Sequence, residues 1–413
     1  MMVATHQQST AYYRLTLTHL KIGDHIAFVR ASTAGCQGSS TSSMNMTSTK
    51  LTATLAAPAE DVKLCIATVS GSIFNGNADQ LTDEMFYDEG LLIRPSMRVK
   101  QHALITSSTQ TVSTSSIIFD SDESTIYVSD YVNGQIQRME SSGTSSTPII
   151  TVFANGLTQI MGMYKDSTTV NSDIFACDLH PGNIWRIPYN HPSNPSVHNK
   201  VQLTLLTSNG VPTNDNIIEL PIDLVVDSDL HEIFVLSGGH NGKVIKLYQT
   251  ENEVNGGDIY RMIEWMPENA ALSLPGTSGM ILGGGITMND KWIYFSCHGT
   301  GNIFKMSRHK NDNNALVMTS LVENGYFQLP QDLVLAGNVL LVADLMANNV
   351  YIVREGEEEE VSIEIAANDL NYPRGIAYYH DDDDHSKTKL YVTELNPNRV
   401  VEILFEDGHG FQN

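Results

Sequence analysis

Basic residues are scarce in this sequence of 413 residues. Its 24 Lys and Arg stand against 47 Asp and Glu, which gives a formal net charge of −23. Nucleic acids and anionic membrane surfaces are bound through clustered Lys and Arg side chains. The charge balance therefore argues against both kinds of partner and is typical of an acidic soluble protein.

Cysteines and long apolar runs are also scarce. The four cysteines, Cys36, Cys65, Cys177 and Cys297, lie far apart, which excludes a C-x-x-C zinc or redox motif and a disulfide scaffold. No apolar run is long enough to span a membrane, and the N-terminus lacks the basic and apolar regions of a secretory signal. We predict reduced thiols in a cytoplasmic protein. The Ser/Thr-rich, acid-poor residues 1–50 leave an organelle transit peptide as the alternative.

Motifs of several common enzyme classes are missing as well. The sequence has no Walker A motif, no G-x-S-x-G, no H-E-x-x-H and no dinucleotide fingerprint. Any chemistry must therefore come from residues that the fold brings together from distant parts of the chain.

What the sequence does contain is a repeated hairpin. The stretch IYVSDYVNGQIQRM (126–139) places a β-rich triplet and an acidic residue before a polar Asn-Gly turn and a second apolar strand. Five later stretches share this layout, and the position of Asp130 is taken in turn by Asp178, Ser237, Cys297, Asp344 and Glu394. Spacings of 47 to 60 residues between these positions indicate a repeat architecture.

Each hairpin is flanked by two further strands. A short apolar strand precedes it, as in PIDLVVD (221–227) and PQDLVLA (330–336), and another apolar strand follows it. Four strands per repeat predict an all-β fold, a single β-propeller of four-stranded blades. A weaker copy that starts at PAEDVKL (58–64) makes seven blades the preferred count and six the alternative.

The two ends of the repeat region predict how the ring closes. The last repeat stops after its third strand, RVVEILFED (399–407), and LTATLAA (51–57) stands where a fourth strand is needed. We expect this N-terminal strand to complete the last blade, which leaves no open edge in the ring. The predicted domains are an N-terminal extension with a Ser/Thr-rich linker (1–50), the propeller (51–408) and a short tail (409–413).

The repeated motifs resemble those of a known group of propellers. The P-x-[GD]-[IL] strands and the [IL]-[YF]-V-x-[DE] strands, spread over residues 58–405, are similar to those of three related families. These are the gluconolactonase and senescence marker protein group, the strictosidine-synthase-like proteins and the NHL-repeat proteins. The resemblance implies the propeller fold, but it selects no single activity because one scaffold hosts many functions.

The resemblance to the gluconolactonase group also implies a metal site. In that group, residues near the start of each first strand converge on a divalent cation, usually calcium, in the central channel. The corresponding positions in this sequence are Glu60, Ser115, Met161, Ile222, Gly284, Gln331 and Arg374. Oxygen donors suit Ca²⁺, so Glu60 and Gln331 fit this role, whereas Met161, Ile222 and Arg374 do not.

Three further acids, Asp61, Asp223 and Asp332, stand one residue beyond the channel positions. Asp223 and Asp332 follow Ile222 and Gln331 directly, where strand alternation turns a side chain away from the channel. They reach the channel only if the strands start irregularly. With that condition, the predicted metal ligands are Glu60, Asp223, Gln331 and Asp332.

Three histidines fall in the turns between the second and third strands of consecutive repeats: His180, His240 and His298. On a propeller these turns share a face with the starts of the first strands. The three side chains could therefore bind a transition metal or act as acid and base; ordinary polar turn residues are the alternative. Asp178 and Asp344 are predicted to cap their own turns by accepting hydrogen bonds from backbone N–H groups.

Three functions remain open at this point. The first is hydrolysis of a small lactone or ester, with a calcium ion polarising the carbonyl and His180, His240 and His298 as candidate catalytic residues. The second is a non-catalytic, NHL-like propeller that binds a small molecule in the channel or a protein on its top face. The third is metal-free condensation of the strictosidine-synthase type, for which Glu60 could supply the channel carboxylate. Whether the protein is an enzyme stays open.

Overall fold

The computed structural model describes most of the chain from residue 113 to residue 403 with its side chains, and the strands alone in residues 1–103. The fully described stretches are 113–120, 125–140, 148–166, 172–189, 200–206, 218–238, 242–249, 259–266, 283–323, 326–356, 361–379, 389–396 and 398–403. Every regular element in these stretches is a strand, and no helix suited to crossing a membrane occurs in them. The chain divides into two compact units, Met1–Arg98 and Val99–Asn413.

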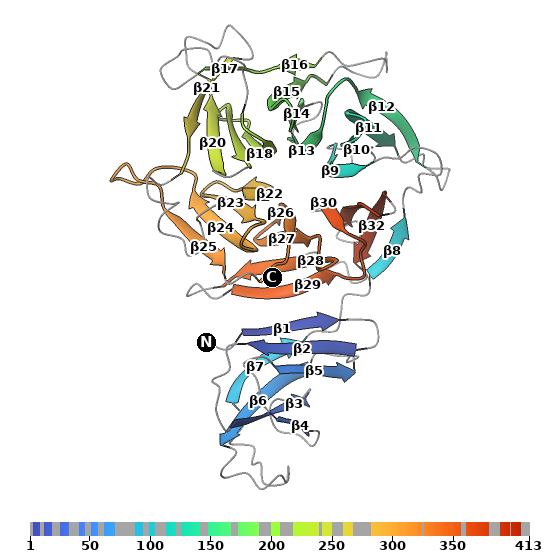
Figure 1. The fold of residues 1–413 in the computed structure, drawn as a ribbon, viewed down its shortest axis with the longest axis vertical. Coiled ribbons are helices and arrows are strands. Elements are labelled where there is room, and N and C mark those ends of the chain that lie inside the picture. The colour runs from blue at the N-terminus through green and yellow to red at the C-terminus, as the bar shows by residue number, and fades with distance from the viewer. Residues whose placement is uncertain are drawn as a thin grey trace. The chain divides into compact units, whose positions relative to one another are not determined.

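The second unit is a β-propeller of six blades (Figure 1). Blade 1 consists of β9 (Thr114–Phe119), β10 (Thr125–Asp130), β11 (Gln135–Glu140) and β12 (Ile149–Ala154). Blade 2 consists of β13 (Ile160–Lys165), β14 (Ile174–Asp178), β15 (Asn183–Ile187) and β16 (Val201–Gln202). Blade 3 consists of β18 (Pro221–Asp227), β19 (Glu232–Ser237), β20 (Lys243–Tyr248) and β21 (Ile259–Glu264), with the short β17 (Thr204–Leu206) added in parallel at its edge.

The remaining three blades repeat the same antiparallel order. Blade 4 consists of β22 (Leu282–Met288), β23 (Trp292–Cys297), β24 (Asn302–Ser307) and β25 (Met318–Val322). Blade 5 consists of β26 (Pro330–Ala336), β27 (Val339–Asp344), β28 (Asn349–Glu355) and β29 (Val361–Ala367). Blade 6 consists of β30 (Pro373–Tyr379), β31 (Lys389–Glu394), β32 (Arg399–Phe405) and, from the start of the unit, β8 (Val99–Ala103).

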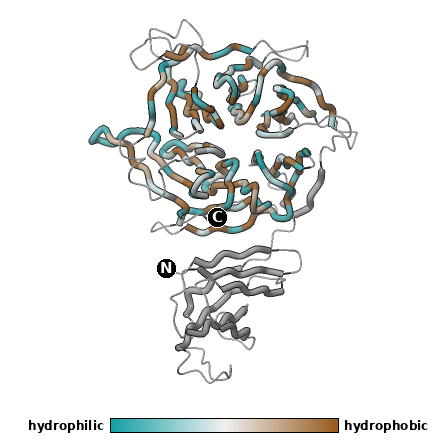
Figure 2. The backbone as a smooth tube through the Cα atoms, viewed as in Figure 1, coloured by the Kyte–Doolittle hydropathy of each residue, from teal (hydrophilic) through white to brown (hydrophobic). Residues whose placement is uncertain are grey.

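The first strand of each blade lies nearest the centre of the ring (Figure 1). Each first strand contacts the first strands of its two neighbours, and β30 contacts β9, so these six strands form a closed inner wall. Val, Ile, Phe and Tyr favour such strands because their branched or aromatic side chains pack well on a pleated surface. Figure 2 shows hydrophobic residues along the described strands of the six blades.

The hydrophobic core lies between neighbouring blades. In the closing seam, Ile117, Phe119 and Val128 of blade 1 pack with Ala377 and Tyr391 of blade 6. The rings of Phe119 and Tyr391 meet edge to face, with centroids 5.2 Å apart. Strand β10 is buried along its whole length, so both of its faces are covered by neighbouring strands and blades.

The hairpin that introduced the repeat forms as predicted. Strands β10 and β11 pair from Thr125–Glu140 to Asp130–Gln135 across a turn that contains Asn133 and Gly134. Gly134 has a φ of 59°, and a Cβ there would lie 1.9 Å from the carbonyl oxygen of Leu157. Only glycine fits this turn without strain.

The blade count is the six that the sequence left as the alternative, and the preference for seven was wrong. Strands β6 (Val62–Ser70) and β7 (Tyr87–Ile93), assigned to a seventh blade, instead extend a sheet with β3 (His25–Ser32) and β4 (Thr41–Asn45). The other sheet of the first unit contains β1 (Val3–Gln8), β2 (Tyr12–Thr18) and β5 (Leu51–Ala56). Strand propensity is the same in a blade and in another sheet, so local pattern could not separate these two arrangements.

The outer strand of blade 6 is not the predicted one. Residues 51–57 were expected there, but β5 pairs with β2, and β8 pairs antiparallel with β32 in the register of Gln101 to Ile403. Both segments read as short β-strands, and the choice between them depends on long-range pairing rather than on local sequence. The linker (33–50) and the tail (409–413) fall mostly outside the described residues, so the predicted domain boundaries stay predictions.

Candidate functional site

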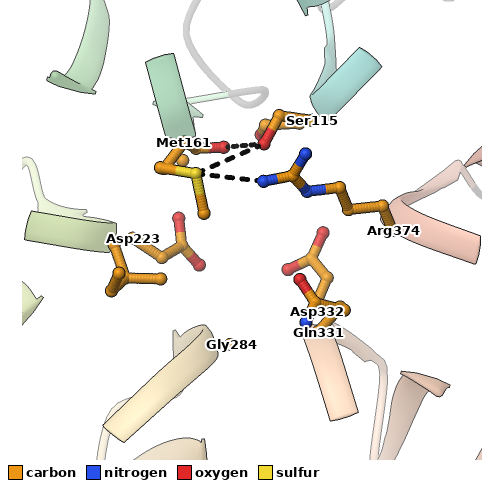
Figure 3. A pocket seen from close by; sticks show the side chains of 10 residues that line it. Ser115, Met161, Asp223, Gly284, Gln331, Asp332 and Arg374 are labelled. Carbon is orange, nitrogen blue, oxygen red and sulfur yellow. Dashed lines mark hydrogen bonds between the residues drawn. The ribbon is translucent and has the colours of Figure 1, made fainter. Parts of the chain in front are cut away.

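The central channel holds a pocket whose wall comes from all six first strands (Figure 3). It encloses about 280 Å³, including the part open to solvent. The residues around it are Ser115, Ser116, Met161, Gly162, Ile222, Asp223, Gly284, Gln331, Asp332 and Arg374. Six of them are the channel positions predicted from the sequence for β9, β13, β18, β22, β26 and β30.

Asp223 and Asp332 reach this pocket because their strands start irregularly. In β18, Pro221 pairs with Ser237 and Asp223 pairs with the adjacent Leu236, so Ile222 is an extra residue. Gln331 is the extra residue of β26 in the same way, and the pairing of the first strand shifts in all six blades. Such a bulge re-aims side chains, so two consecutive residues can line one pocket.

The second residue of each bulge follows an alternating pattern around the ring. Blades 1, 3 and 5 have a side-chain acceptor there, and each accepts a hydrogen bond from a backbone N–H of the next blade. These bonds join Met163 N to Ser116 Oγ (3.2 Å), Ile286 N to Asp223 Oδ2 (2.9 Å) and Ile376 N to Asp332 Oδ2 (2.8 Å). The two aspartates therefore clamp neighbouring blades together, as Ser116 does.

Blades 2, 4 and 6 have glycine at the same position: Gly162, Gly285 and Gly375. A Cβ on Gly162 would lie 2.1 Å from Asp223 Oδ1, and one on Gly285 would lie 2.7 Å from the Cα of Asp332. The glycines thus leave room for the acceptor residues of the following blade. The ring is built from three pairs of blades, each with one acceptor and one glycine.

Burial and mutual repulsion set the protonation of the two aspartates. Burial, and then the charge of Asp332, raises the pKa of Asp223 well above its usual value, against the hydrogen bonds from Ile286 and Leu224. Burial raises the pKa of Asp332 to about 7, against the hydrogen bonds from Ile376 and Leu333. Both carboxyl groups point into the channel (Figure 3). Near neutral pH the pair therefore holds a proton that isolated aspartates would lose.

Arg374 supplies the positive charge of the pocket. One guanidinium N–H donates to the Met161 sulfur at 3.0 Å, and the guanidinium lies 5.2 Å from the centroid of the Tyr131 ring. Burial lowers the pKa of Arg374, and the Tyr131 hydroxyl opposes this shift. Among the described residues no carboxylate forms an ion pair with Arg374, although Asp223 and Asp332 line the same pocket.

The three predicted histidines are not brought together where the chain is described. His298 lies beside the channel, and its Nε2 is 2.9 Å from Nε2 of Gln331. Burial, and then the charge of Arg374, lowers the pKa of His298 to about 4, against the hydrogen bond to the Pro330 carbonyl. His180 is exposed in the turn between β14 and β15, and His240 lies outside the described residues. The catalytic role of all three stays a prediction.

The predicted calcium ligands are only partly assembled. Asp223, Gln331 and Asp332 line the pocket, whereas Glu60 lies outside the described residues. Ca²⁺ takes six to eight oxygen ligands. The described wall offers few such oxygens beside a guanidinium, and in this part of the chain no three His, Cys, Asp or Glu side chains form a metal-binding group. The described residues do not fit a calcium site, and we assign no chemical step to calcium.

The acids of the second strands hold the loops that lead into the channel. Asp178 accepts hydrogen bonds from the backbone N–H groups of Thr158 and Gln159, just before β13. This corrects the prediction that Asp178 caps its own turn. Asp344 does both, since it binds Ala347 N in its turn and the N–H groups of residues 328 and 329 before β26. These bonds fix the starts of the first strands, which line the pocket.

Sequence reasoning missed the significance of Arg374 and Tyr131. Arg374 was correctly placed on the channel wall, but only as a residue unsuited to binding a cation. A lone arginine at a channel position, with an aromatic residue directly after the acid of another repeat, was the signal for the cation–π contact found in the channel. Cys177 and Cys297 are buried, and neither forms a disulfide with another described residue.

Comparison with known proteins identifies the fold. No family model matches the sequence, and no curated protein matches it. A gluconolactonase from Xanthomonas campestris superposes with a TM-score of 0.51 at 12% identity, covering 75% of this chain and 91% of its own. A luciferin-regenerating enzyme gives a TM-score of 0.53 at 10% identity, covering 75% of this chain and 96% of its own.

A third solved structure spans more of the chain. An auxiliary nutrient binding protein from Bacteroides ovatus superposes with a TM-score of 0.51 at 11% identity, covering 95% of this chain and 94% of its own. At such identities these likenesses show a shared fold and no more. The predicted resemblance to gluconolactonase-like propellers is confirmed at the level of the fold.

Proposed function

We propose that this protein binds a small polar molecule in the central channel of its propeller. The observation that carries this proposal is the channel pocket, where residues of all six blades meet and polar groups of both charges face one space. Ligand sites are typically concave, with a few convergent polar groups and titratable residues of shifted pKa. The pocket is narrow, so it suits a ligand of few atoms.

Binding without catalysis accounts for the polar groups better than hydrolysis does. Asp223 and Asp332 already have a structural role as clamps between blades, which Ser116 performs at the third equivalent position. A nucleophile must lie beside a base. In the pocket, however, Ser115 Oγ donates to the Met161 carbonyl, and His298, beside the channel, pairs with Gln331.

The comparisons are consistent with a binding protein. The Bacteroides ovatus protein, described as an auxiliary nutrient binding protein, superposes over 95% of this chain, whereas the gluconolactonase superposes over 75%. A fold shared over both units supports binding as a function, and the ligand must be found by experiment.

A screen by thermal melting tests the proposal. Small polar molecules, including sugars, lactones and amino acids, would be added to the full-length protein, and the best would be titrated by calorimetry. A ligand that binds only the folded state raises the melting temperature. Ile222→Trp should fill the pocket without changing its charge and weaken binding by at least about tenfold. Ile149→Trp, on the exposed outer strand β12, is the matched control.

Binding that survives in Ile222→Trp would place the ligand elsewhere and contradict the proposal, provided that the variant melts cooperatively without ligand. Absence of any stabilising molecule at millimolar concentration would also contradict it. The top-face protein partner of the sequence analysis then becomes the next candidate.

Hydrolysis of a small lactone or ester is the second candidate. The specific observation in its favour is Asp332, whose pKa of about 7 suits a general acid and base at neutral pH. Water would attack the carbonyl carbon while Asp332 takes its proton, and the ring oxygen would then leave and receive that proton. Incubation with simple lactones tests this, and Asp332→Asn should lower the rate by about 10²-fold or more. An equal rate in Asp332→Asn would reject the mechanism.

A further inference from the structure

The charged groups of the pocket come from different blades. Asp223 belongs to blade 3 and Asp332 to blade 5, whereas Arg374 belongs to blade 6, which lies opposite blade 3 in a ring of six. Arg374 reaches toward Met161 of blade 2 and forms no ion pair with either aspartate. The pocket therefore keeps positive and negative groups apart, although a charge in a partly buried site is stabilised by an opposite charge.

On the positive side of the pocket, the N–H donors of the Arg374 guanidinium suit a carboxylate. A guanidinium has five N–H donors, and the described acceptor of Arg374 is the Met161 sulfur, which accepts hydrogen bonds weakly. The Tyr131 ring supports the guanidinium through a cation–π contact and takes up none of its N–H donors. A carboxylate matches a guanidinium in two parallel hydrogen bonds.

On the negative side of the pocket, backbone hydrogen bonds hold the carboxyl groups of Asp223 and Asp332 in place. Asp332 accepts from the N–H of Leu333 at 2.8 Å and from that of Ile376 at 2.8 Å, and Asp223 accepts from Ile286. An ionised carboxylate has about four acceptor sites, so each aspartate can accept further bonds. The two carboxyl groups repel each other when both are charged. An ammonium group between them would replace this repulsion by attraction.

We propose that the channel pocket binds a small zwitterion, with its carboxylate on Arg374 and its ammonium group on Asp223 and Asp332. This inference rests on the proposed function, that the pocket holds a small polar ligand. The narrow pocket between the six first strands restricts the ligand to a compact amino acid or a molecule of similar size. A molecule with only one of the two charged groups can pair either with Arg374 or with the two aspartates, and it leaves the other charge of the pocket without a partner.

Calorimetry with matched probes tests the zwitterion. Glycine, 3-aminopropanoate and 4-aminobutanoate differ in the separation of their two charges, while butanoate and butylamine each keep one charge of the longest member. Each would be titrated into the full-length protein at pH 7. At least one zwitterion should bind at least tenfold more tightly than both singly charged probes. Equal affinities, or no binding of any zwitterion up to millimolar concentration, would overturn the inference.

Arg374→Met tests the positive wall with its apolar stem retained. It should weaken zwitterion binding at least tenfold and leave butylamine binding unchanged. Arg354→Met, on β28 outside the pocket, is the matched control and should change neither. Unchanged zwitterion binding in Arg374→Met would overturn the inference. If the variant does not fold, the comparison among probes on the natural protein decides.

The failure of this inference differs from the failure of the proposed function. If uncharged sugars or lactones bind, lose affinity in Ile222→Trp and keep it in Arg374→Met, the channel is a ligand site but not a zwitterion site. If no molecule of either kind binds in the channel, both proposals fall.

Discussion

Asp332 makes the stability of the protein depend on pH. Its pKa is about 7 in the folded protein against a usual value of 3.8, so between these values the folded state holds more protons than the unfolded state. The free energy of unfolding must then fall as pH rises from about 4 to about 7. We expect Asp332→Asn to remove this part of the slope, on the order of 4 kcal/mol, in urea titrations at several pH values.

A matched control separates this local effect from the general repulsion of an acidic protein. Asp229→Asn removes the same charge from an exposed position after β18 and should leave the slope nearly unchanged. If Asp332→Asn and Asp229→Asn flatten the curve equally, the channel carboxylates are not the origin of the pH dependence.

A buried ion pair joins blades 1 and 2. Lys165 Nζ lies 3.2 Å from Asp120 Oδ1, and their side chains are 0% and 7% exposed. Lys165→Met removes the positive charge beside a buried carboxylate, which typically costs about 3–5 kcal/mol of unfolding free energy. Lys243→Met breaks a pair whose side chains are 36% and 61% exposed and should cost at most about 1 kcal/mol. Denaturant midpoints of the two variants test this, and equal losses would contradict it.

At the scale of the strand, the glycines of blades 2, 4 and 6 set how closely first strands approach. A Cβ on Gly285 would lie 2.3 Å from the backbone nitrogen of Leu333, so Gly285→Ala must push two blades apart. We expect a loss of about 1–3 kcal/mol, measured by thermal melting. In Gly337→Ala nothing lies within 4 Å of the new Cβ. The loss of stability then comes only from the positive φ of 61° and should be about 1 kcal/mol. A larger loss in Gly337→Ala would refute the close-approach argument.

The closing strand β8 offers a test by proline. In an antiparallel edge strand, one of two consecutive residues points its N–H at the partner, and the next points its N–H away. Lys100 and Gln101 pair with Leu404 and Ile403 of β32, so one of Lys100→Pro and Gln101→Pro should lower the melting temperature markedly more than the other. Gln101→Ala serves as the control. If both proline variants melt like the natural protein, β8 does not close the ring.

Strand type and channel position were predictable because both repeat at regular intervals in the chain. The motif that starts with Pro221 in β18 recurs with Pro330 in β26. The second residue of this motif, Ile222 or Gln331, was therefore predicted on the channel wall from the sequence alone, and both residues line the pocket. The bulge was not predictable, because it arises from pairing with the second strand. Without the bulge, simple alternation points Asp223 and Asp332 away from the pocket.

At the scale of the whole molecule, ring closure and blade count depend on contacts between segments far apart in sequence. The β6 and β7 segments have the composition of blade strands, and only their pairing partners show that they belong elsewhere. The proposed binding site has the same origin, since Asp223, Asp332 and Arg374 line one pocket only when the ring closes. No local motif contains all three.

The most direct test of the central claim is a crystal structure of the full-length protein with the tightest-binding zwitterion of the series. The account predicts the ligand in the channel pocket, with its carboxylate on the Arg374 guanidinium and its ammonium group on Asp223 and Asp332. A ligand bound outside the channel would contradict the account, and so would a metal ion held between the two aspartates in its place.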